Sequence, residues 1–171
     1  MKHVKHNWLL ITGLLGLVGA LGTGIGEFFL LYSPDGGHGI AEGYRNFLHR
    51  TPEQLTLGFY ISAFSAPLYI IGYWHVVNML NLAKSWFRWV IMGVAVFGFM
   101  SGLSWLLTNA YLGIIVHTIA ATDGAVSIAM TDLLAKIDAL SLPLLQVVRA
   151  TVMLLSLFFV YFVLKLSLIH I

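Results

Sequence analysis

Long uncharged stretches dominate the pattern of hydrophobic and polar positions along the chain. Residues 6–26, 54–83 and 89–122 contain no Asp, Glu, Lys or Arg, and residues 139–164 contain only Arg149. A helix of about 20 consecutive apolar residues crosses a bilayer core that is about 30 Å thick. We therefore predict four transmembrane helices, at residues 8–31, 53–81, 87–116 and 142–165.

Signals for helix ends support these boundaries. Thr51 can cap the second span, Pro52 suits a first helical position, and Gln54 can return the hydrogen bond in a capping box. The sequence Ser-Leu-Pro at 141–143 predicts the start of the fourth span in a similar way. Residues 32–37 should end the first span, because the Pro, Asp and Gly residues there cannot continue a helix.

Two connections between the predicted spans are longer than a turn and amphipathic. In residues 33–52 and 123–138, apolar side chains recur at helical spacing opposite polar and charged ones. The two apolar stripes are Ile40, Tyr44, Phe47 and Leu48, and Val126, Met130, Leu133 and Ile137. We predict a short amphipathic helix in each connection, lying at the membrane interface or capping the bundle, without a ligand of its own.

Composition supports an all-α membrane protein whose single integral membrane domain, residues 1–171, is a four-helix bundle. The chain is 59% hydrophobic and 9% charged, whereas an ordinary soluble domain has roughly 25% charged residues. No cysteine is present, which excludes disulfides and thiolate metal sites. The formal net charge is +2 without a basic run, so the expected partner is the lipid bilayer and not a nucleic acid.

The distribution of basic residues predicts the orientation of the chain. If the N-terminus lies inside, the inner segments contain five basic residues and no acidic one, Lys2, Lys5, Lys84, Arg88 and Lys165, and three basic residues lie outside. This bias places both termini in the cytoplasm, in what we expect to be a bacterial inner membrane. The first span should be a retained helix and not a cleaved signal peptide, because its apolar run continues to Leu31.

Two charged residues, Glu27 and Arg149, lie well inside the predicted spans, both in the outer leaflet. A single charge at that depth is costly, so we predict that the two side chains form an ion pair. The alternatives are a polar pocket in which the pair orients a ligand, and an Arg149 that extends to the headgroups without pairing. Trp105, Asn109 and Gln146 lie at similar depths and complete the candidate ligand-binding residues.

His75 is the histidine that lies well within a span, and it is a candidate cofactor ligand. The simplest expectation is a hydrogen bond to a carbonyl group or to Asn78. A haem would need a second axial ligand at similar depth, and His6 and His170 lie only at the interface on that side, so no cofactor is expected although haem remains an alternative. No metal site is predicted, although three outer histidines could meet in space, His38, His49 and His117.

Small residues recur on the first two spans, where they permit close backbone contact. The first span contains the rows Gly16, Ala20 and Gly24, and Gly22 and Gly26, and the second contains Gly58, Ser62 and Ala66. We expect these two helices to pack closely; a homodimer contact through Gly22 and Gly26 is the alternative. Pro67 should kink the second span and free the carbonyl group of Ala63.

One segment of the chain resembles known proteins. It comprises the run Arg50-Thr51-Pro52-Glu53-Gln54-Leu55, then Gly58, the run Ala66-Pro67-Leu68-Tyr69 and Gly72. These residues are similar to a segment of small uncharacterised bacterial integral membrane proteins with four spans. The resemblance implies the four-helix fold and no activity. Emopamil-binding-like isomerases share only the number of spans, and a shared fold does not transfer function.

These observations favour a non-enzymatic integral membrane protein, either an accessory subunit of a larger complex or a small binder of a lipophilic ligand. Its polar site would surround Glu27 and Arg149, in a cavity among the outer halves of the first, third and fourth spans. One alternative is an isomerase-like membrane enzyme with Glu27 as acid or base. The other is a haem- or quinone-binding redox subunit that uses His75.

Overall fold

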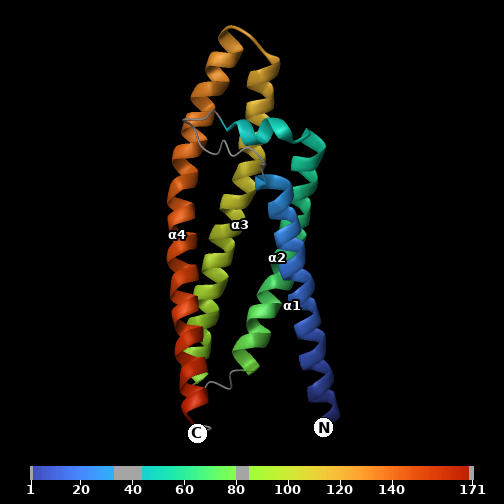
Figure 1. Cartoon of the computed structure of the whole chain (residues 1–171), viewed down its shortest axis with the longest axis vertical. Coiled ribbons are helices and arrows are strands. Elements are labelled where there is room, and N and C mark those ends of the chain that lie inside the picture. The colour runs from blue at the N-terminus through green and yellow to red at the C-terminus, as the bar shows by residue number, and fades with distance from the viewer. Residues whose placement is uncertain (1, 33–43, 80–84, 170–171) are drawn as a thin grey trace.

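The computed structural model describes residues 2–32, 44–79 and 85–169 (Figure 1). Its elements are α1 (Lys2–Leu31), the 3₁₀ helix η2 (Arg45–His49), α2 (Pro52–Met79), α3 (Ser85–Ala121) and α4 (Ala125–Ile169). The four α-helices are each long and apolar enough to cross a membrane, and no strand occurs in the described ranges. The predicted all-α fold with four spans is therefore confirmed.

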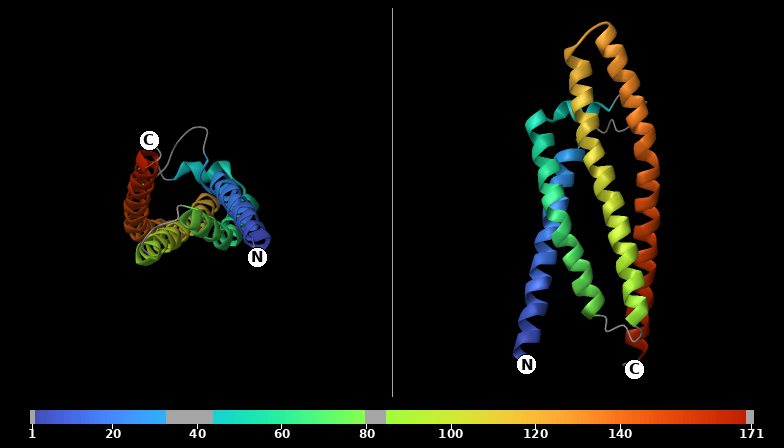
Figure 2. Two further views of the ribbon diagram at one scale, coloured as in Figure 1. Left: turned by 90° about the horizontal axis from the view of Figure 1, so that it is seen from below. Right: turned by 180° about the vertical axis from the view of Figure 1, so that it is seen from behind.

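The helices form an open arc and not a closed bundle (Figure 2, left). Helix α1 packs mainly on α2, α2 packs on α3, and α3 packs on α4. Helices α1 and α4 therefore lie at the two ends of the arc, with an open side between them. The Lys2 end of α1 and the Ile169 end of α4 lie at the same end of the molecule (Figure 1).

The predicted capping box at the start of α2 is confirmed. The backbone amide of Thr51 donates to the Gln54 side-chain oxygen (3.0 Å), and the Gln54 amide donates to the Thr51 hydroxyl (3.3 Å). Pro52 is the first residue of the helix, where its missing N–H leaves no bond unmade. Local chemistry thus determines where α2 begins.

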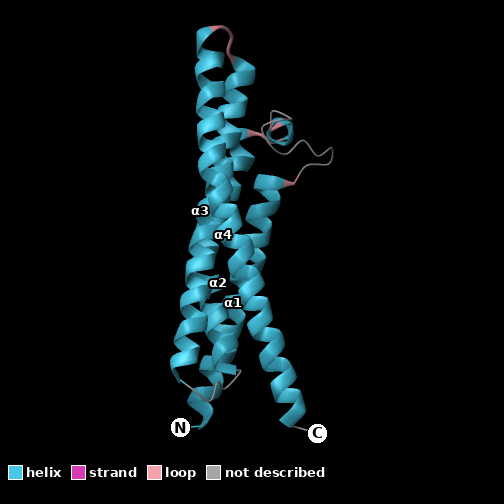
Figure 3. Cartoon of the chain, turned by 90° about the vertical axis from the view of Figure 1, so that its left-hand side faces the viewer, coloured by secondary structure: helices cyan, strands magenta, loops and turns pink. Residues whose placement is uncertain are grey.

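The helix start predicted at residues 141–143 is wrong, because α4 already begins at Ala125 and continues through Pro143. The Ser141 hydroxyl donates to the Asp138 carbonyl (2.9 Å) inside this helix and does not cap a new one. The amphipathic helix predicted in residues 123–138 therefore exists, but as the first turns of α4. As a result, α3 and α4 continue side by side beyond the end of α1 (Figure 3).

The connection between α1 and α2 contains η2, which is shorter than the amphipathic helix predicted there; Ile40 lies outside the described residues. Phe47 of η2 is fully buried against α3, and His117 of α3 forms a 3.0 Å hydrogen bond with the Phe47 carbonyl oxygen. The hydroxyl of buried Tyr44 donates to the carboxylate of Asp138 in α4. These contacts attach η2 to the α3–α4 pair.

Arg50 connects the segment after η2 to the end of α1. Its side chain is buried, and the guanidinium donates to the backbone carbonyl of Tyr32, just after the last residue of α1. The guanidinium carbon also lies 5.6 Å from the ring centre of Phe28 and 5.4 Å from that of Tyr32. A cation is stabilised both by the helix C-terminus and by these aromatic faces.

The predicted close packing of the first two helices is confirmed, and the predicted small residues Gly22 and Gly26 of α1 and Gly58 and Ser62 of α2 take part in it. A Cβ atom added at Gly16 would lie 2.4 Å from the Cα of Gly72, and one added at Gly26 would lie 2.2 Å from the Ser62 hydroxyl. The contact row on α1 is Gly16, Gly19, Gly22 and Gly26. A Cβ atom added at Gly24 would meet no other described helix within 4 Å, so Gly24 does not belong to this row. Because α2 covers Gly22 and Gly26, that face is not available for the alternative homodimer contact.

The buried core is divided into two clusters along the arc. One cluster joins Leu30, Phe47 and Leu55 to the part of α3 that begins at Leu106. The other lies toward the termini and contains Val77, Ile91, Met92, Ala95 and Leu155. The stretch of α3 between Ala95 and Leu106 separates the two clusters.

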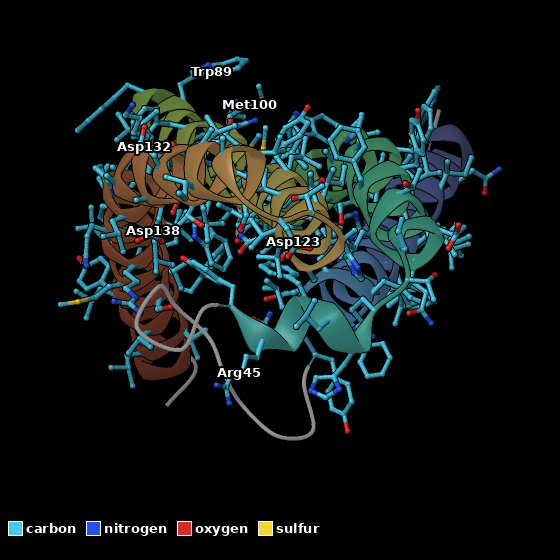
Figure 4. The ribbon with its side chains drawn as sticks, turned by 90° about the horizontal axis from the view of Figure 1, so that it is seen from above. Arg45, Trp89, Met100, Asp123, Asp132 and Asp138 are labelled. Atoms are coloured by element: carbon cyan, nitrogen blue, oxygen red, sulfur yellow. The ribbon has the colours of Figure 1, made fainter. Side chains whose placement is uncertain are left out.

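Large apolar side chains are exposed on the outer faces of all four helices, as expected for contact with lipid. Trp8, Trp86 and Trp89 are exposed near the end of the bundle where the termini lie, in agreement with their expected role as interfacial anchors. Trp89 and Met100 project from the outer face of α3 (Figure 4).

Candidate functional site

A cavity of about 240 Å³, which we call the central cavity, lies between the two core clusters. All four helices contribute to its lining, which includes Thr23 and Glu27 of α1, Tyr69 and Tyr73 of α2, Phe99 and Trp105 of α3, and Val148, Thr151 and Val152 of α4. The lining is mostly apolar and aromatic, with few polar groups. This combination is typical of a site for a lipophilic molecule.

Glu27 is the charged side chain in this lining, and it is exposed. It lies one turn before the end of α1 at Leu31. Thr23, one turn deeper on the same face, donates its hydroxyl to the Gly19 carbonyl (2.9 Å). Within the described ranges, no residue donates a hydrogen bond to the Glu27 carboxylate, so both of its oxygens can accept one from a ligand.

The aromatic side chains of α2 and α3 form the inner wall of the central cavity. The rings of Tyr69 and Phe99 are stacked with their centres 4.6 Å apart, and the ring of Tyr73 lies 5.4 Å from that of Tyr69. The stacking of Tyr69 on Phe99 bridges α2 and α3 at the cavity.

The structure brings together two of the five predicted ligand-binding residues, Glu27 and Trp105. Asn109 is buried, but its side-chain amide donates to the Trp105 carbonyl (2.8 Å), one turn earlier on its own helix, and it does not line the cavity. Thr, Ser and Asn side chains often satisfy their polar groups on the backbone in this way. Asn109 therefore supports the backbone behind Trp105.

Gln146 and Arg149 are exposed on α4 and do not belong to the lining of the central cavity. Val148 and Val152 occupy the lining instead, and Arg149 flanks them, since successive residues of a helix are rotated by about 100°. The predicted direct ion pair between Glu27 and Arg149 does not form. The physical reason is the order of the helices, which places α1 and α4 at opposite ends of the arc (Figure 2).

The ion pair present among the described residues lies outside this site. Lys136 and Asp132 of α4, four residues apart along the helix, pair at 2.5 Å, and both side chains are exposed. Exposed pairs of this kind contribute about 0.3–0.5 kcal/mol. The pair marks the polar surface of α4 and has no connection to the cavity.

A second cavity of about 350 Å³, which we call the His75 cavity, lies toward the termini. It is lined by Gly13, Leu17 and Ala20 of α1, by Tyr69, Tyr73, His75 and Val76 of α2, and by Phe159 of α4. Tyr69 and Tyr73 line both cavities. The two cavities are therefore neighbours on the inner side of the arc.

His75 is bonded differently from the expectation. Its Nδ1 atom lies 3.0 Å from the hydroxyl oxygen of Thr12 in α1, and not against a carbonyl or Asn78. Asn78 instead donates to the Trp74 carbonyl (2.7 Å) and accepts from Arg88 (3.3 Å). The side chain of His6 and all of His170 and His38 lie outside the described parts of the structure.

Several lining residues were not anticipated, notably Thr23, Tyr69, Tyr73, Phe99 and Thr151. Two spacing signals point to them: Thr23 precedes Glu27 by four residues, and Tyr69 precedes Tyr73 by four, so each pair shares one helix face. No local signal identifies Phe99 or Thr151, because their position depends on how α3 and α4 pack.

No model of a known protein family, no curated protein and no solved structure matches the chain. The resemblance of residues 50–72 to small bacterial four-span proteins is supported only as far as the number, length and apolar character of the helices. The chain is an integral membrane protein with four spans.

Proposed function

We propose that this protein binds a lipophilic molecule that carries a hydrogen-bond-donating or cationic head group. The apolar body would occupy the central cavity, and Glu27 would receive the head group. The observation that supports this proposal is the lining itself, which comes from all four helices and includes one carboxylate, that of Glu27, to which no described residue donates a hydrogen bond.

The electrostatics of the site favour an amine or ammonium head group. A carboxylate near the hydrocarbon region interacts more strongly with a cation than it would in water, because the dielectric constant is lower. The exposed Arg149 flanks the opposite wall and disfavours a second cation there. A neutral donor such as a hydroxyl group would bind more weakly, since hydrogen bonds between charged partners are about twice as strong.

The open side of the arc provides a route from the bilayer. Helices α1 and α4 are not packed together along their length, so a lipophilic molecule would reach the cavity laterally, without crossing the polar headgroup layer on its own. As part of this proposal, the protein lies in a bacterial inner membrane with both termini in the cytoplasm. In that orientation, Glu27 lies in the outer leaflet.

Binding of two matched probes to the protein in lipid nanodiscs tests this proposal. The first is an alkylamine with a dansyl group at the far end of its chain, and the second is the corresponding alcohol; energy transfer from tryptophan reports binding, with empty nanodiscs as the baseline. We expect the amine to bind more tightly than the alcohol. Glu27→Gln should reduce amine affinity about tenfold or more, because it removes a charge-assisted hydrogen bond.

Two further variants make the result specific. Trp105→Phe should remove most of the energy transfer, because Trp105 lines the cavity. Asp132→Asn changes the formal charge by the same amount at an exposed site on α4 and should leave amine affinity unchanged. Equal amine affinity in the wild-type protein and Glu27→Gln would overturn the proposal.

A further inference from the structure

We propose that His75 forms a second binding site, which accepts a hydrogen bond from the hydroxyl group of a lipophilic alcohol or phenol. This inference does not depend on the role of Glu27. Two observations support it. The hydroxyl of Thr12 in α1 lies against Nδ1 of His75 in α2, and the His75 ring lines a cavity.

The hydroxyl of Thr12 determines which nitrogen of His75 carries the proton. The Thr12 oxygen lies 2.9 Å from the Trp8 carbonyl oxygen, 3.1 Å from the Leu9 carbonyl oxygen and 3.0 Å from His75 Nδ1. Carbonyl oxygens have no proton to donate, so the Thr12 proton must lie in one of the two short oxygen–oxygen contacts. Thr12 then accepts a hydrogen bond from His75.

The tautomer of His75 follows from this assignment. A neutral imidazole carries one proton, and here Nδ1 carries it in order to donate to Thr12. The Nε2 atom is therefore left with a lone pair and can only accept.

His75 and Gly13 both line the His75 cavity. The ring packs on Gly13, where an added Cβ atom would lie 3.3 Å from Nε2 and 3.2 Å from Cε1. No described residue forms a hydrogen bond with Nε2. The absence of a side chain at position 13 leaves room for the ring at the edge of the cavity.

The surroundings restrict the class of ligand. Leu17, Val76 and Phe159 provide apolar walls, and the cavity volume of about 350 Å³ suits a hydrocarbon or aromatic body. An acceptor nitrogen requires a donor, so ethers, esters and quinones, which only accept, do not satisfy it. A neutral hydroxyl satisfies it without burying a charge.

Two ligands that differ only in whether the oxygen carries a hydrogen or a methyl group test this assignment. We compare 4-nonylphenol with its methyl ether in nanodiscs, by their quenching of intrinsic tryptophan fluorescence relative to empty nanodiscs. The phenol should bind about three- to tenfold more tightly than the ether, because one hydrogen bond changes the affinity by about this factor. His75→Phe should remove this difference and leave binding of the ether unchanged. Equal binding of the two ligands to the wild-type protein would overturn the assignment.

Further variants and a spectrum separate a binding role from a structural one. Gly13→Ala should displace the ring and reduce the preference for phenol, whereas Gly24→Ala, where nothing lies within 4 Å, should not. The ¹⁵N NMR spectrum of histidine-labelled protein should show an unprotonated Nε2 for the resonance that disappears in His75→Phe. A protonated Nε2, or haem binding that depends on His75, would contradict the proposal. Amine binding at Glu27 should be unaffected by His75→Phe, so either proposal can fail alone.

Discussion

Gly19 of α1 lies in backbone contact with Tyr69 of α2: a Cβ atom added at Gly19 would lie 2.3 Å from the Tyr69 amide nitrogen. Tyr69 lines both cavities and stacks on Phe99 of α3. The close approach of the two helices therefore determines where the aromatic wall of the binding region lies. Without it, Tyr69 would move away from the centre of the arc.

Gly19→Val should destabilise the protein because the new side chain collides with backbone atoms, which cannot move aside as a flexible side chain can. Overpacking of this kind costs about 1–3 kcal/mol or more. Thermal unfolding in detergent micelles measures the effect. Gly24→Val is the matched control, since nothing lies within 4 Å of that position, and an equal loss of stability in both variants would contradict the helix contact.

Arg50→Met should destabilise the protein by about 2–4 kcal/mol, because it removes a charged hydrogen bond to the end of α1 and two aromatic contacts. Arg45→Met is a suitable control: Arg45 is exposed and projects outward from η2 (Figure 4). Denaturant unfolding of both variants measures the difference. If Arg45→Met were as damaging as Arg50→Met, loss of charge and not loss of these contacts would be the cause.

Stability should fall at high pH through Tyr44. Burial, together with the hydrogen bond to Asp138, raises the pKa of Tyr44 well above its usual value. The raised pKa means that the folded protein favours the protonated phenol. The contribution of Tyr44 to the free energy of unfolding is therefore complete below about pH 10, and it is lost as the pH rises toward the folded-state pKa. Unfolding measured between about pH 8 and pH 12 should show the loss in the wild-type protein. Tyr44→Phe should lack this part of the pH dependence.

Features that depend on neighbouring residues could be predicted from the sequence, whereas contacts between helices could not. The four spans and the Thr51–Gln54 capping box follow from local patterns, and both are present. The absence of a helix boundary at Pro143 shows the limit of such signals, since a proline within a long helix need not end it.

The candidate site shows the same division. Glu27 and Trp105 could be placed in one cavity from their predicted depth in the spans, and both line the central cavity. Depth could not show that α1 and α4 lie at opposite ends of an arc, which separates Arg149 from Glu27. The hydrogen bond between Thr12 and His75 joins residues far apart in sequence and depends on the register of α1 against α2.

The orientation of the chain remains a prediction from its basic residues. Reporter fusions after Gly37 and after Gly124 should both show an external location, since both positions precede spans that return toward the cytoplasm. A cytoplasmic signal at either position would contradict the predicted topology. It would also move Glu27 to the inner leaflet.

The main claim is that the central cavity binds a lipophilic amine. Photolabelling tests this claim most directly. An alkylamine with a diazirine in its chain is bound to the protein in nanodiscs, irradiated, and mapped by mass spectrometry of peptides. The account predicts labels at cavity residues such as Glu27 and Trp105, which decrease with excess unlabelled alkylamine and in Glu27→Gln. Labels confined to outer-face residues such as Leu14 and Phe64, insensitive to competition, would contradict it.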